Sequence, residues 1–344
     1  MMRRLLLPAC LAALALSAAA LPARAQPVRF VAFGDMPYCQ PAAPERCPAE
    51  EGRVARLMAT INAARPAFSI FVGDTKGGAE LCTDDKLLRA LSWMTLADHP
   101  LVYTPGDNEW TDCWQGRAGR YDPQERLALL RQRFFPGAES LGRRPMPVQQ
   151  QAAPFVENAR WQRDGILFLT LHVPGSNNSR PAEPGEPGAA GLPRGPAALA
   201  EFEARDAANR AWLAASFAAA PEARGAVIAL QADMFYRQVC GQGYDSGYRA
   251  IREAIAGTAR AFGRPVLLIN GDSHYFVHHE PLEGVPNLTR LQVPGEADAQ
   301  AVVVTFDPAA DRPFRFELIG EAGSPPARPP CAGYDSSIRS TRAG

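Results

Sequence analysis

Lysine and histidine are both scarce in this chain of 344 residues. Of the 36 basic residues, 34 are arginine and only Lys76 and Lys86 are lysine, and histidine occurs five times. Sites for zinc or iron usually draw on several imidazoles, so the low histidine count disfavours them. Because arginine is this chain's ordinary choice for a surface cation, the compact point charge of Lys76 stands out.

Several familiar catalytic signatures are absent as well. The sequence has no Gly-x-Ser-x-Gly turn for a serine nucleophile, no Walker sequence and no Gly-x-Gly-x-x-Gly fingerprint. No Cys-x-x-Cys spacing occurs, which disfavours a zinc site built from thiolates. These absences argue against a serine hydrolase of that type, a P-loop nucleotidase and a dinucleotide-binding enzyme.

Neither charge nor hydropathy indicates a large partner. The sequence has 36 acidic residues against 36 basic ones, and a balanced chain gives no support for a surface that binds nucleic acid. After the first 25 residues, no apolar run approaches the roughly 18 residues that span a bilayer. We therefore expect no nucleic-acid partner and no membrane span, while the sequence leaves the oligomeric state open.

The first 25 residues have the pattern of an export signal. Arg3 and Arg4 precede an apolar run from Leu5 to Leu21, and Ala23-Arg24-Ala25 fits the small-x-small cleavage pattern. We expect a signal peptide over residues 1–25 and a periplasmic or secreted protein.

Six cysteines remain after this segment, which is enough for three disulfides in an oxidising compartment. Six cysteines admit 15 pairings, and the sequence alone does not choose among them. We expect Cys39 with Cys47, Cys82 with Cys113, and Cys240 with Cys331, because each of these pairings would tie loops near the expected site. A free thiol or two in the core is the alternative.

Four apolar runs end in Gly-Asp, and these set the expected architecture. The runs at 28–33, 68–72, 100–104 and 266–269 read as strands, and they deliver the carboxylates of Asp35, Asp74, Asp107 and Asp272. Open α/β sheets bind ligands beyond the carboxyl ends of their strands, so these aspartates are expected to converge. Carboxylates held close together take up protons or cations, which points to a site for hard divalent metal.

The remaining segments predict one α/β domain. Between the first three strands lie helical segments at 50–64 and 84–97, and this alternation implies parallel pairing with right-handed crossovers. Further helices are expected at 122–135, 197–219 and 246–262, and further strands at 154–161, 165–172 and 225–230. Three β segments at 287–293, 301–306 and 314–319 could form a second sheet. Residues 26–320 are expected to form the domain, and 321–344 a proline-rich irregular tail.

Five motifs in order carry a resemblance to a known family. They are GDMPY (34–38), GDTK (73–76), GDNEW (106–110), LQADMF (230–235) and GDSH (271–274). This set resembles the calcineurin-like metallophosphoesterases, whose motifs are Asp-x-His, Gly-Asp, Gly-Asn-His-Asp/Glu, a strand-end His and Gly-His-x-His. The resemblance implies a two-sheet β-sandwich flanked by helices in four layers, a dinuclear metal centre and a small phosphorylated substrate.

The resemblance assigns metal-binding roles residue by residue. Asp35 matches the aspartate on the first metal and Asp74 the bridging one. Asp107 stands where the family has an asparagine ligand, Asp272 matches the first histidine of the last motif, and His274 matches the second.

The departures from the family pattern replace imidazoles by oxygens. Pro37 stands where the first motif has its histidine, and Tyr38 follows as a candidate ligand because tyrosinate serves in related purple acid phosphatases. Gln231 or Asp233 replaces the strand-end histidine, and Asn108 replaces the catalytic one. Oxygen ligands suit Mn²⁺, Mg²⁺ or Ca²⁺ better than zinc or iron, and two such ions would approximately balance four aspartates.

Other side chains are candidates for catalysis and substrate binding. Lys76 could contact a phosphate oxygen or replace one ion, or it could be a solvent-facing turn residue. His172 could act as general acid in place of the missing imidazole, with Asn177 contacting substrate, or it could be a structural histidine. Glu109 and Trp110 could contact substrate or water, or serve capping and packing.

The sequence thus predicts an exported phosphoesterase that hydrolyses a phosphomonoester or phosphodiester with metal-activated water. The alternative is a non-catalytic module that uses the same fold to bind a metal ion or an anion.

Overall fold

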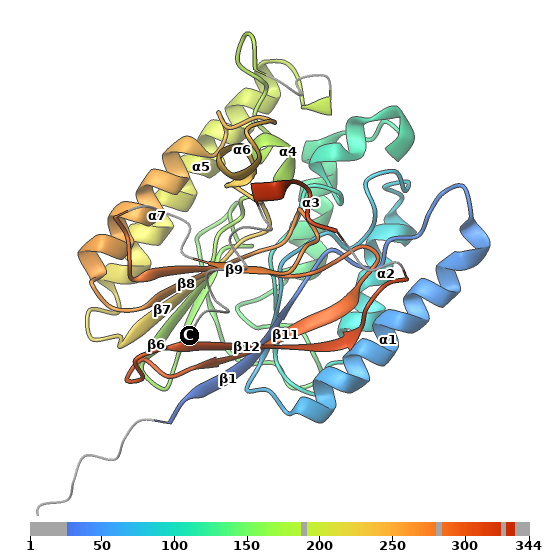
Figure 1. Cartoon of the computed structure of the whole chain (residues 1–344). Coiled ribbons are helices and arrows are strands. Elements are labelled where there is room, and N and C mark those ends of the chain that lie inside the picture. Colours follow the sequence, from blue (N-terminus) through green and yellow to red (C-terminus); the bar gives the residue numbers. More distant parts are fainter. Residues whose placement is uncertain (1–25, 187–190, 280–283, 325–327, 334–344) are drawn as a thin grey trace, which may run out of the picture.

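The computed structural model describes residues 26–186, 191–279, 284–324 and 328–333, and shows two mixed β-sheets covered by helices (Figure 1). The expected signal peptide, residues 1–25, lies outside the described residues, as do 325–327 and 334–344 of the expected tail. None of the helices within the described residues is both long and apolar enough to cross a bilayer.

The first sheet has five strands in the order β12-β11-β1-β2-β3. Their bounds are β1 Val28–Phe33, β2 Ser69–Phe71, β3 Leu101–Tyr103, β11 Ala299–Phe306 and β12 Phe314–Glu321. Strands β1, β2 and β3 are parallel, whereas β11 pairs antiparallel with both β1 and β12. The carboxyl ends of β1, β2 and β3 therefore lie at one edge of the sheet.

The second sheet has seven strands in the order β4-β5-β6-β7-β8-β10-β9. Their bounds are β4 Gln149–Gln150, β5 Ala159–Arg163, β6 Ile166–Thr170, β7 Gly225–Ala229, β8 Val266–Asn270, β9 Val277–His279 and β10 Leu288–Gln292. Strands β6, β7, β8 and β10 run parallel to one another, and β5 and β9 are antiparallel to their neighbours.

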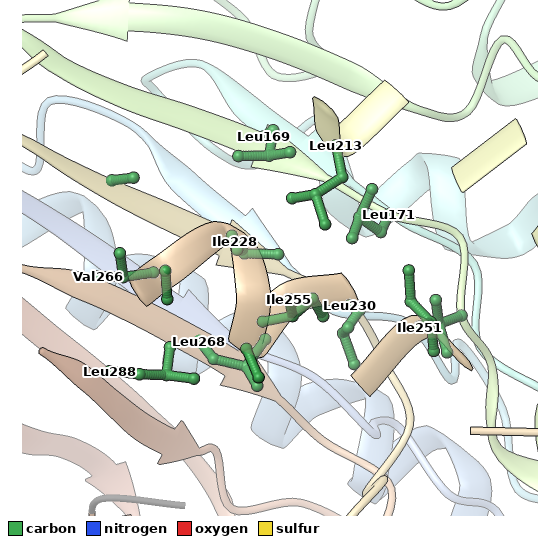
Figure 2. Packing of buried hydrophobic residues seen from close by; sticks show 14 of the residues in the cluster. Leu169, Leu171, Leu213, Ile228, Leu230, Ile251, Ile255, Val266, Leu268 and Leu288 are labelled. Atoms are coloured by element: carbon green, nitrogen blue, oxygen red, sulfur yellow. The ribbon is translucent and has the colours of Figure 1, made fainter. Parts of the chain in front are cut away.

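Helices cover the outer face of each sheet. Their bounds are α1 Cys47–Ala64, α2 Asp84–Met94, α3 Pro123–Phe134, α4 Gly175–Asn178, α5 Pro196–Ala218, α6 Tyr236–Cys240 and α7 Arg249–Phe262, with short 3₁₀ turns η1 Pro44–Arg46, η2 Thr111–Trp114 and η3 Gly116–Ala118. Side chains of α1, α2 and α3 share a core with the five-stranded sheet. Those of α5 and α7 share one with the seven-stranded sheet, as Figure 2 shows.

A third core fills the space between the two sheets and completes the four layers. Phe30 of β1 and Phe168 of β6 meet there edge to face with ring centroids 5.4 Å apart. Alternation along each strand explains this arrangement, because successive side chains point to opposite faces. In β1, Phe30 enters the central core while Val31 and Phe33 enter the core beneath the helices. Burial of each phenylalanine contributes about 1.5–3 kcal/mol.

The two-sheet α/β sandwich predicted from the sequence is confirmed, but the expected membership of its second sheet is wrong. β10 pairs with β8, whereas β11 pairs with β1 in the other sheet. The strand expected at 154–161 begins only at Ala159, because 154–158 form turns. Four short elements, α4, α6, β4 and β9, were not anticipated from the sequence.

The structure forms the three disulfides expected from the sequence. Their Cα–Cα separations are 4.8 Å for Cys39–Cys47, 5.7 Å for Cys82–Cys113 and 5.7 Å for Cys240–Cys331. The second lies beneath the turn after β3, with both sulfurs 3.6–3.7 Å from the Asn108 carbonyl oxygen. The third ties α6 to the segment 328–333.

Candidate metal centre

The carboxyl ends of the two sheets meet, and hydrogen bonds join their turns. The backbone N–H of Asp272, after β8, donates to Oδ1 of Asp35, after β1, at 2.9 Å. Gln231, after β7, donates from Nε2 to Oδ1 of Asp107, after β3, at 3.3 Å. Residues more than 120 positions apart in the sequence are thus in direct contact at one edge of the sandwich.

Four residues of these turns adopt the left-handed backbone conformation. The φ angles are 57° at Asp35, 60° at Asp74, 74° at Asp272 and 59° at His274. This conformation costs a non-glycine residue about 1–2 kcal/mol. Such strain persists only where the surroundings enforce it, and it is concentrated at functional sites.

Asp35, Asp74 and His274 form a group whose potential ligand atoms all lie within 4.8 Å of one another. Oδ2 of Asp35 is buried and has no hydrogen-bond partner among the described residues. A Cβ added to Gly271 would collide with this same oxygen, so the oxygen packs against the turn where only glycine leaves room for it. A buried carboxylate oxygen without a donor is suited to receive a cation.

Tyr38 and Asn108 surround the second carboxylate of this group. Oδ2 of Asp74 accepts a hydrogen bond from the Tyr38 hydroxyl at 2.7 Å and another from Asn108 Nδ2 at 2.8 Å. Asn108 Nδ2 also donates to the Tyr38 oxygen at 2.9 Å, and that oxygen lies 3.2 Å from Nε2 of His274. Tyr38 therefore sits between Asp74 and His274.

Burial raises the pKa values of the carboxylates in this centre. It raises the pKa of Asp35 to about 7, although the His274 charge opposes the shift. Burial, then the charges of Asp107 and Glu109, raise the pKa of Asp74. Burial lowers the pKa of His274, but the hydrogen bond to Glu296 and the charge of Asp35 outweigh it, and the net shift is upward. The centre thus accumulates negative charge that needs protons or cations.

Asp107 and Asp272 lie next to this group, and a carboxylate oxygen of each approaches Gly175 closely. Ser176 Oγ lies 2.8 Å from Oδ2 of Asp107 and 2.7 Å from Oδ1 of Asp112. A hydroxyl carries one hydrogen and donates to one acceptor. The second contact is satisfied if Asp112 is protonated, and burial together with the charge of Asp107 raises the pKa of Asp112 to about 7.

The centre opens to solvent through a pocket of about 350 Å³. Its lining includes Tyr38, Asp74, Asp107, Asn108, Asp272 and His274 among the residues considered from the sequence, together with Gln40, Glu80, Arg117 and Glu296. Arg117 is the one arginine of this lining and is exposed, and its positive charge acts on the buried carboxyl of Asp112. A polyanion entering this pocket would meet its guanidinium.

Lys76 and Glu109 lie beneath the pocket and do not line it. The Lys76 ammonium is fully buried and donates to the carbonyl oxygens of Gly77 at 3.2 Å and Glu80 at 3.0 Å. Glu109 Oε1 accepts from the backbone N–H groups of Asp74 at 3.1 Å and Gly106 at 2.9 Å. Both side chains hold the turns that present the site.

His172, Trp110 and Asn177 are also buried away from the pocket. Nδ1 of His172 lies 2.8 Å from Oε1 of Glu157, and its ring packs against Trp110 with centroids 5.3 Å apart. Asn177 donates to Ser246 Oγ at 2.9 Å. The structure does not bring these three side chains to the place where a substrate would bind, because none of them lines the pocket.

The two candidates for the strand-end position have different surroundings. Gln231 contacts Asp107 directly, as described above. Asp233 is held by Arg290 at 2.6 Å and Ser273 Oγ at 2.6 Å. An arginine already neutralises the Asp233 carboxylate, so Gln231 is the better placed of the two to support the centre.

Sequence reasoning missed four residues at this edge. Glu296 contacts His274 Nδ1 at 3.2 Å, Ser176 and Asp112 flank Asp107, and Arg117 lines the pocket. The strand-end turn that carries Glu296 follows β10 in the same way as the Gly-Asp turns follow their strands. The other three have no comparable signal, since nothing in the sequence shows which way their loops face.

The residues present fit a divalent ion. They offer carboxylates, a phenol and one imidazole, the donor set that suits hard or borderline ions. The buried Asp35 oxygen without a donor lies within the same group. A second group, formed by Cys39, Cys47 and Glu51, does not fit, because its cysteines are joined in a disulfide.

Comparison with known proteins gives structural matches only. No protein-family model and no curated protein matches the sequence. A dimetal phosphatase from Danio rerio aligns at a TM-score of 0.50 and 8% identity over 86% of this chain and 100% of that chain. A purple acid phosphatase from yellow lupin aligns at a TM-score of 0.48 and 12% identity over 90% of this chain and 53% of that chain. A 5'-nucleotidase from Candida albicans aligns at a TM-score of 0.40 and 10% identity over 85% of this chain and 51% of that chain.

This chain spans about half the length of the lupin and Candida proteins, and all of the zebrafish phosphatase. At 8% identity the zebrafish match shows the fold alone. The chain has the fold of this dimetal phosphatase, as the resemblance to the calcineurin-like metallophosphoesterases implied.

Proposed function

We propose that this chain is an exported, metal-dependent phosphoesterase. The observation that carries the proposal is the convergence of Asp35, Asp74 and His274 within 4.8 Å, with one buried Asp35 oxygen lacking a donor. The fold, shared with a dimetal phosphatase, supports it. Three disulfides support an oxidising compartment, periplasmic or extracellular.

The proposed ligands of two divalent ions are Asp35, Asp74, Asp107, Asp272 and His274, with Tyr38 as a further candidate. Their oxygens favour Mn²⁺, Mg²⁺ or Ca²⁺ over zinc and iron. Such ions supply Lewis acidity that activates water and offsets charge on phosphoryl oxygens. Tyr38 and Asn108 orient Asp74 through their hydrogen bonds to it.

The proposed substrate is a small phosphomonoester or phosphodiester. Arg117 binds its non-bridging oxygens, since a guanidinium matches phosphate geometry and this one is exposed in the pocket lining. No imidazole lies on the open side of the pocket as a dedicated general acid; His274 is held between Tyr38 and Glu296. Esters with good leaving groups, such as aryl phosphates, are therefore favoured over alkyl monoesters.

The test combines metal content with turnover. Purified protein loaded with Mn²⁺, Mg²⁺, Ca²⁺ or Zn²⁺ is assayed on 4-nitrophenyl phosphate and bis(4-nitrophenyl) phosphate. Asp74→Asn should lower kcat/KM by about 100-fold or more, because several kcal/mol of charge stabilisation depend on the ions it holds. Asp311→Asn, at an exposed turn between β11 and β12, is the matched control and should change nothing.

The non-catalytic alternative predicts a different outcome of the same experiment. A binding module would hold an ion at Asp74 and lose it in Asp74→Asn, yet would hydrolyse neither ester with any of the four metals. Absence of turnover together with tight metal binding would therefore replace the enzyme proposal by that alternative.

A further inference from the structure

The segment Gly175–Ser179 follows β6 and has a backbone that L-amino acids rarely adopt. Four consecutive non-glycine residues are left-handed, with φ of 46° at Ser176, 58° at Asn177, 56° at Asn178 and 58° at Ser179. Left-handed residues normally occur singly, at about 1–2 kcal/mol each. A run of four needs strong external support.

That support comes from buried hydrogen bonds to two other parts of the chain. Asn177 accepts from Gly247 N–H at 2.8 Å and Asn178 donates to the Gly247 carbonyl at 3.0 Å. Arg205 of α5 donates to the Asn178 carbonyl oxygen at 2.8 Å. All four residues of the run are at most 7% exposed. The turn is thus held rigidly from α5 and from the loop before α7.

The side of this turn that faces the metal centre has a specific shape. A Cβ added to Gly175 would lie 2.7 Å from Oδ2 of Asp107 and 2.7 Å from Oδ1 of Asp272. Only glycine allows both carboxylates to approach the turn so closely. The next side chain, Ser176, places its hydroxyl 2.8 Å from the same Asp107 oxygen.

Ser179 provides an internal comparison within the same turn. It shares the left-handed backbone and the burial, at 3% exposure. Its hydroxyl, however, accepts a hydrogen bond from Thr111 Oγ1 at 2.6 Å and touches no carboxylate of the centre. The two serines therefore differ in what their hydroxyls contact and not in backbone conformation.

We propose that Ser176 is a positioning residue that fixes the Asp107 carboxylate in the orientation required to bind a divalent ion. Oδ2 of Asp107 lies 2.8 Å from Ser176 Oγ, whose single hydrogen also has Asp112 Oδ1 within reach at 2.7 Å. Oδ1 of Asp107 receives a hydrogen bond from Gln231. When hydrogen bonds fix the orientation of both its oxygens, Asp107 presents its remaining lone pairs to the pocket that it lines. This inference rests on one part of the proposed function, namely that Asp107 binds a divalent ion.

The test uses Ser176→Gly and Ser179→Gly. Glycine tolerates a positive φ, so both variants lose a hydroxyl without adding backbone strain and should fold. Mn²⁺ is titrated calorimetrically into EDTA-treated protein, and unfolding by urea is measured in parallel. Ser176→Gly should weaken Mn²⁺ binding at one site by about 10-fold or more, the usual effect of losing an orienting partner. Ser179→Gly should leave Mn²⁺ affinity unchanged.

The outcomes separate this inference from the proposed function. Equal Mn²⁺ affinity in wild type and Ser176→Gly, or an equal loss in both glycine variants, overturns the positioning role and leaves the proposed function standing. The predicted affinity difference without hydrolysis of any ester supports the positioning role and refutes the enzyme. A wild-type chain that binds no Mn²⁺ refutes both. Ser176→Ala serves as a second variant, and its affinity should fall as in Ser176→Gly.

Discussion

Oε1 of Glu109 accepts a hydrogen bond of 3.1 Å from the backbone N–H of Asp74. The same oxygen accepts from Gly106 N–H at 2.9 Å and from the Tyr103 hydroxyl at 2.8 Å. One buried carboxylate therefore ties the turn after β2 to the turn after β3. Glu109 directly follows Asp107 and Asn108 in the sequence. Its side chain nevertheless lies beneath the site and does not line the pocket.

Glu109→Ala is expected to destabilise the protein more than Glu109→Gln. Alanine leaves three buried donors without an acceptor, at a total cost of roughly 3–5 kcal/mol. Glutamine retains an oxygen that can accept these hydrogen bonds. Burial raises the pKa of Glu109 and so disfavours its negative charge, which means that replacing it by a neutral side chain costs little. Urea unfolding of both variants measures the difference. Equal loss in the two would show that the charge of Glu109, and not its accepting oxygen, holds the turns.

Tyr38→Phe is expected to weaken metal binding with little effect on stability. The hydroxyl contacts Asp74 and lies within 3.2 Å of His274, so its loss frees two proposed ligands to rotate. Loss of such a partner typically costs about 10–100-fold in affinity. The measurement is Mn²⁺ titration, with Tyr121→Phe as the control because its ring packs under Arg126 and away from the centre. An unchanged affinity in Tyr38→Phe would remove Tyr38 from the site.

Arg117→Gln is expected to raise KM for an aryl phosphate by about 10-fold while metal content stays unchanged. The side chain lines the pocket but contacts none of the proposed ligands, and a charge-assisted hydrogen bond to phosphate contributes about 1.5–3 kcal/mol. Arg120→Gln, in the same loop but outside the pocket lining, is the control. If both variants behave alike, general surface charge and not a specific contact attracts the substrate.

Acid should destabilise the fold through Glu157. Burial raises the pKa of this carboxylate, but the hydrogen bond from His172 and the charge of Arg131, at 2.6 Å, outweigh it and lower the pKa to about 2. A carboxylate whose pKa is lowered by folding stabilises the fold at any pH above its pKa in the unfolded chain. This contribution is lost as the pH falls through the pKa in the folded protein. Between about pH 5 and pH 2 the loss should be on the order of 3 kcal/mol.

Glu157→Gln isolates this contribution. Its free energy of unfolding should lie below that of the wild type at pH 7, and the gap between the two proteins should narrow as the pH falls toward 2. Urea titrations at several pH values measure the gap. A gap that stays constant across this range would mean that Glu157 does not titrate as the geometry implies.

The sequence predicted the convergence of the aspartates because the signal is local and physical. A strand followed by Gly-Asp delivers a carboxylate to the strand's carboxyl end, and parallel strands share that edge. Asp35 and Asp272, on different sheets, meet for this reason. Short apolar runs likewise indicated the strands themselves.

Partner choice and loop direction were not predictable in the same way. The apolar pattern of residues 287–293 indicates a strand but does not specify its neighbour, and β10 joined β8. Lys76 follows Asp74 closely in the sequence, yet its side chain turns to the carbonyls of its own loop. The left-handed turn that brings Ser176 to Asp107 depends on Arg205 and Gly247, which are distant in the sequence.

The central claim is that Asp35, Asp74 and His274 jointly bind a divalent ion. Anomalous diffraction from crystals grown with Mn²⁺ tests it most directly. We expect a strong anomalous peak in contact with Asp35, Asp74 and His274, at the ~2.0–2.3 Å distances of Mn–O and Mn–N bonds, and a second peak beside Asp107 and Asp272. A map with no peak at these residues, in crystals saturated with the metal, would contradict the claim.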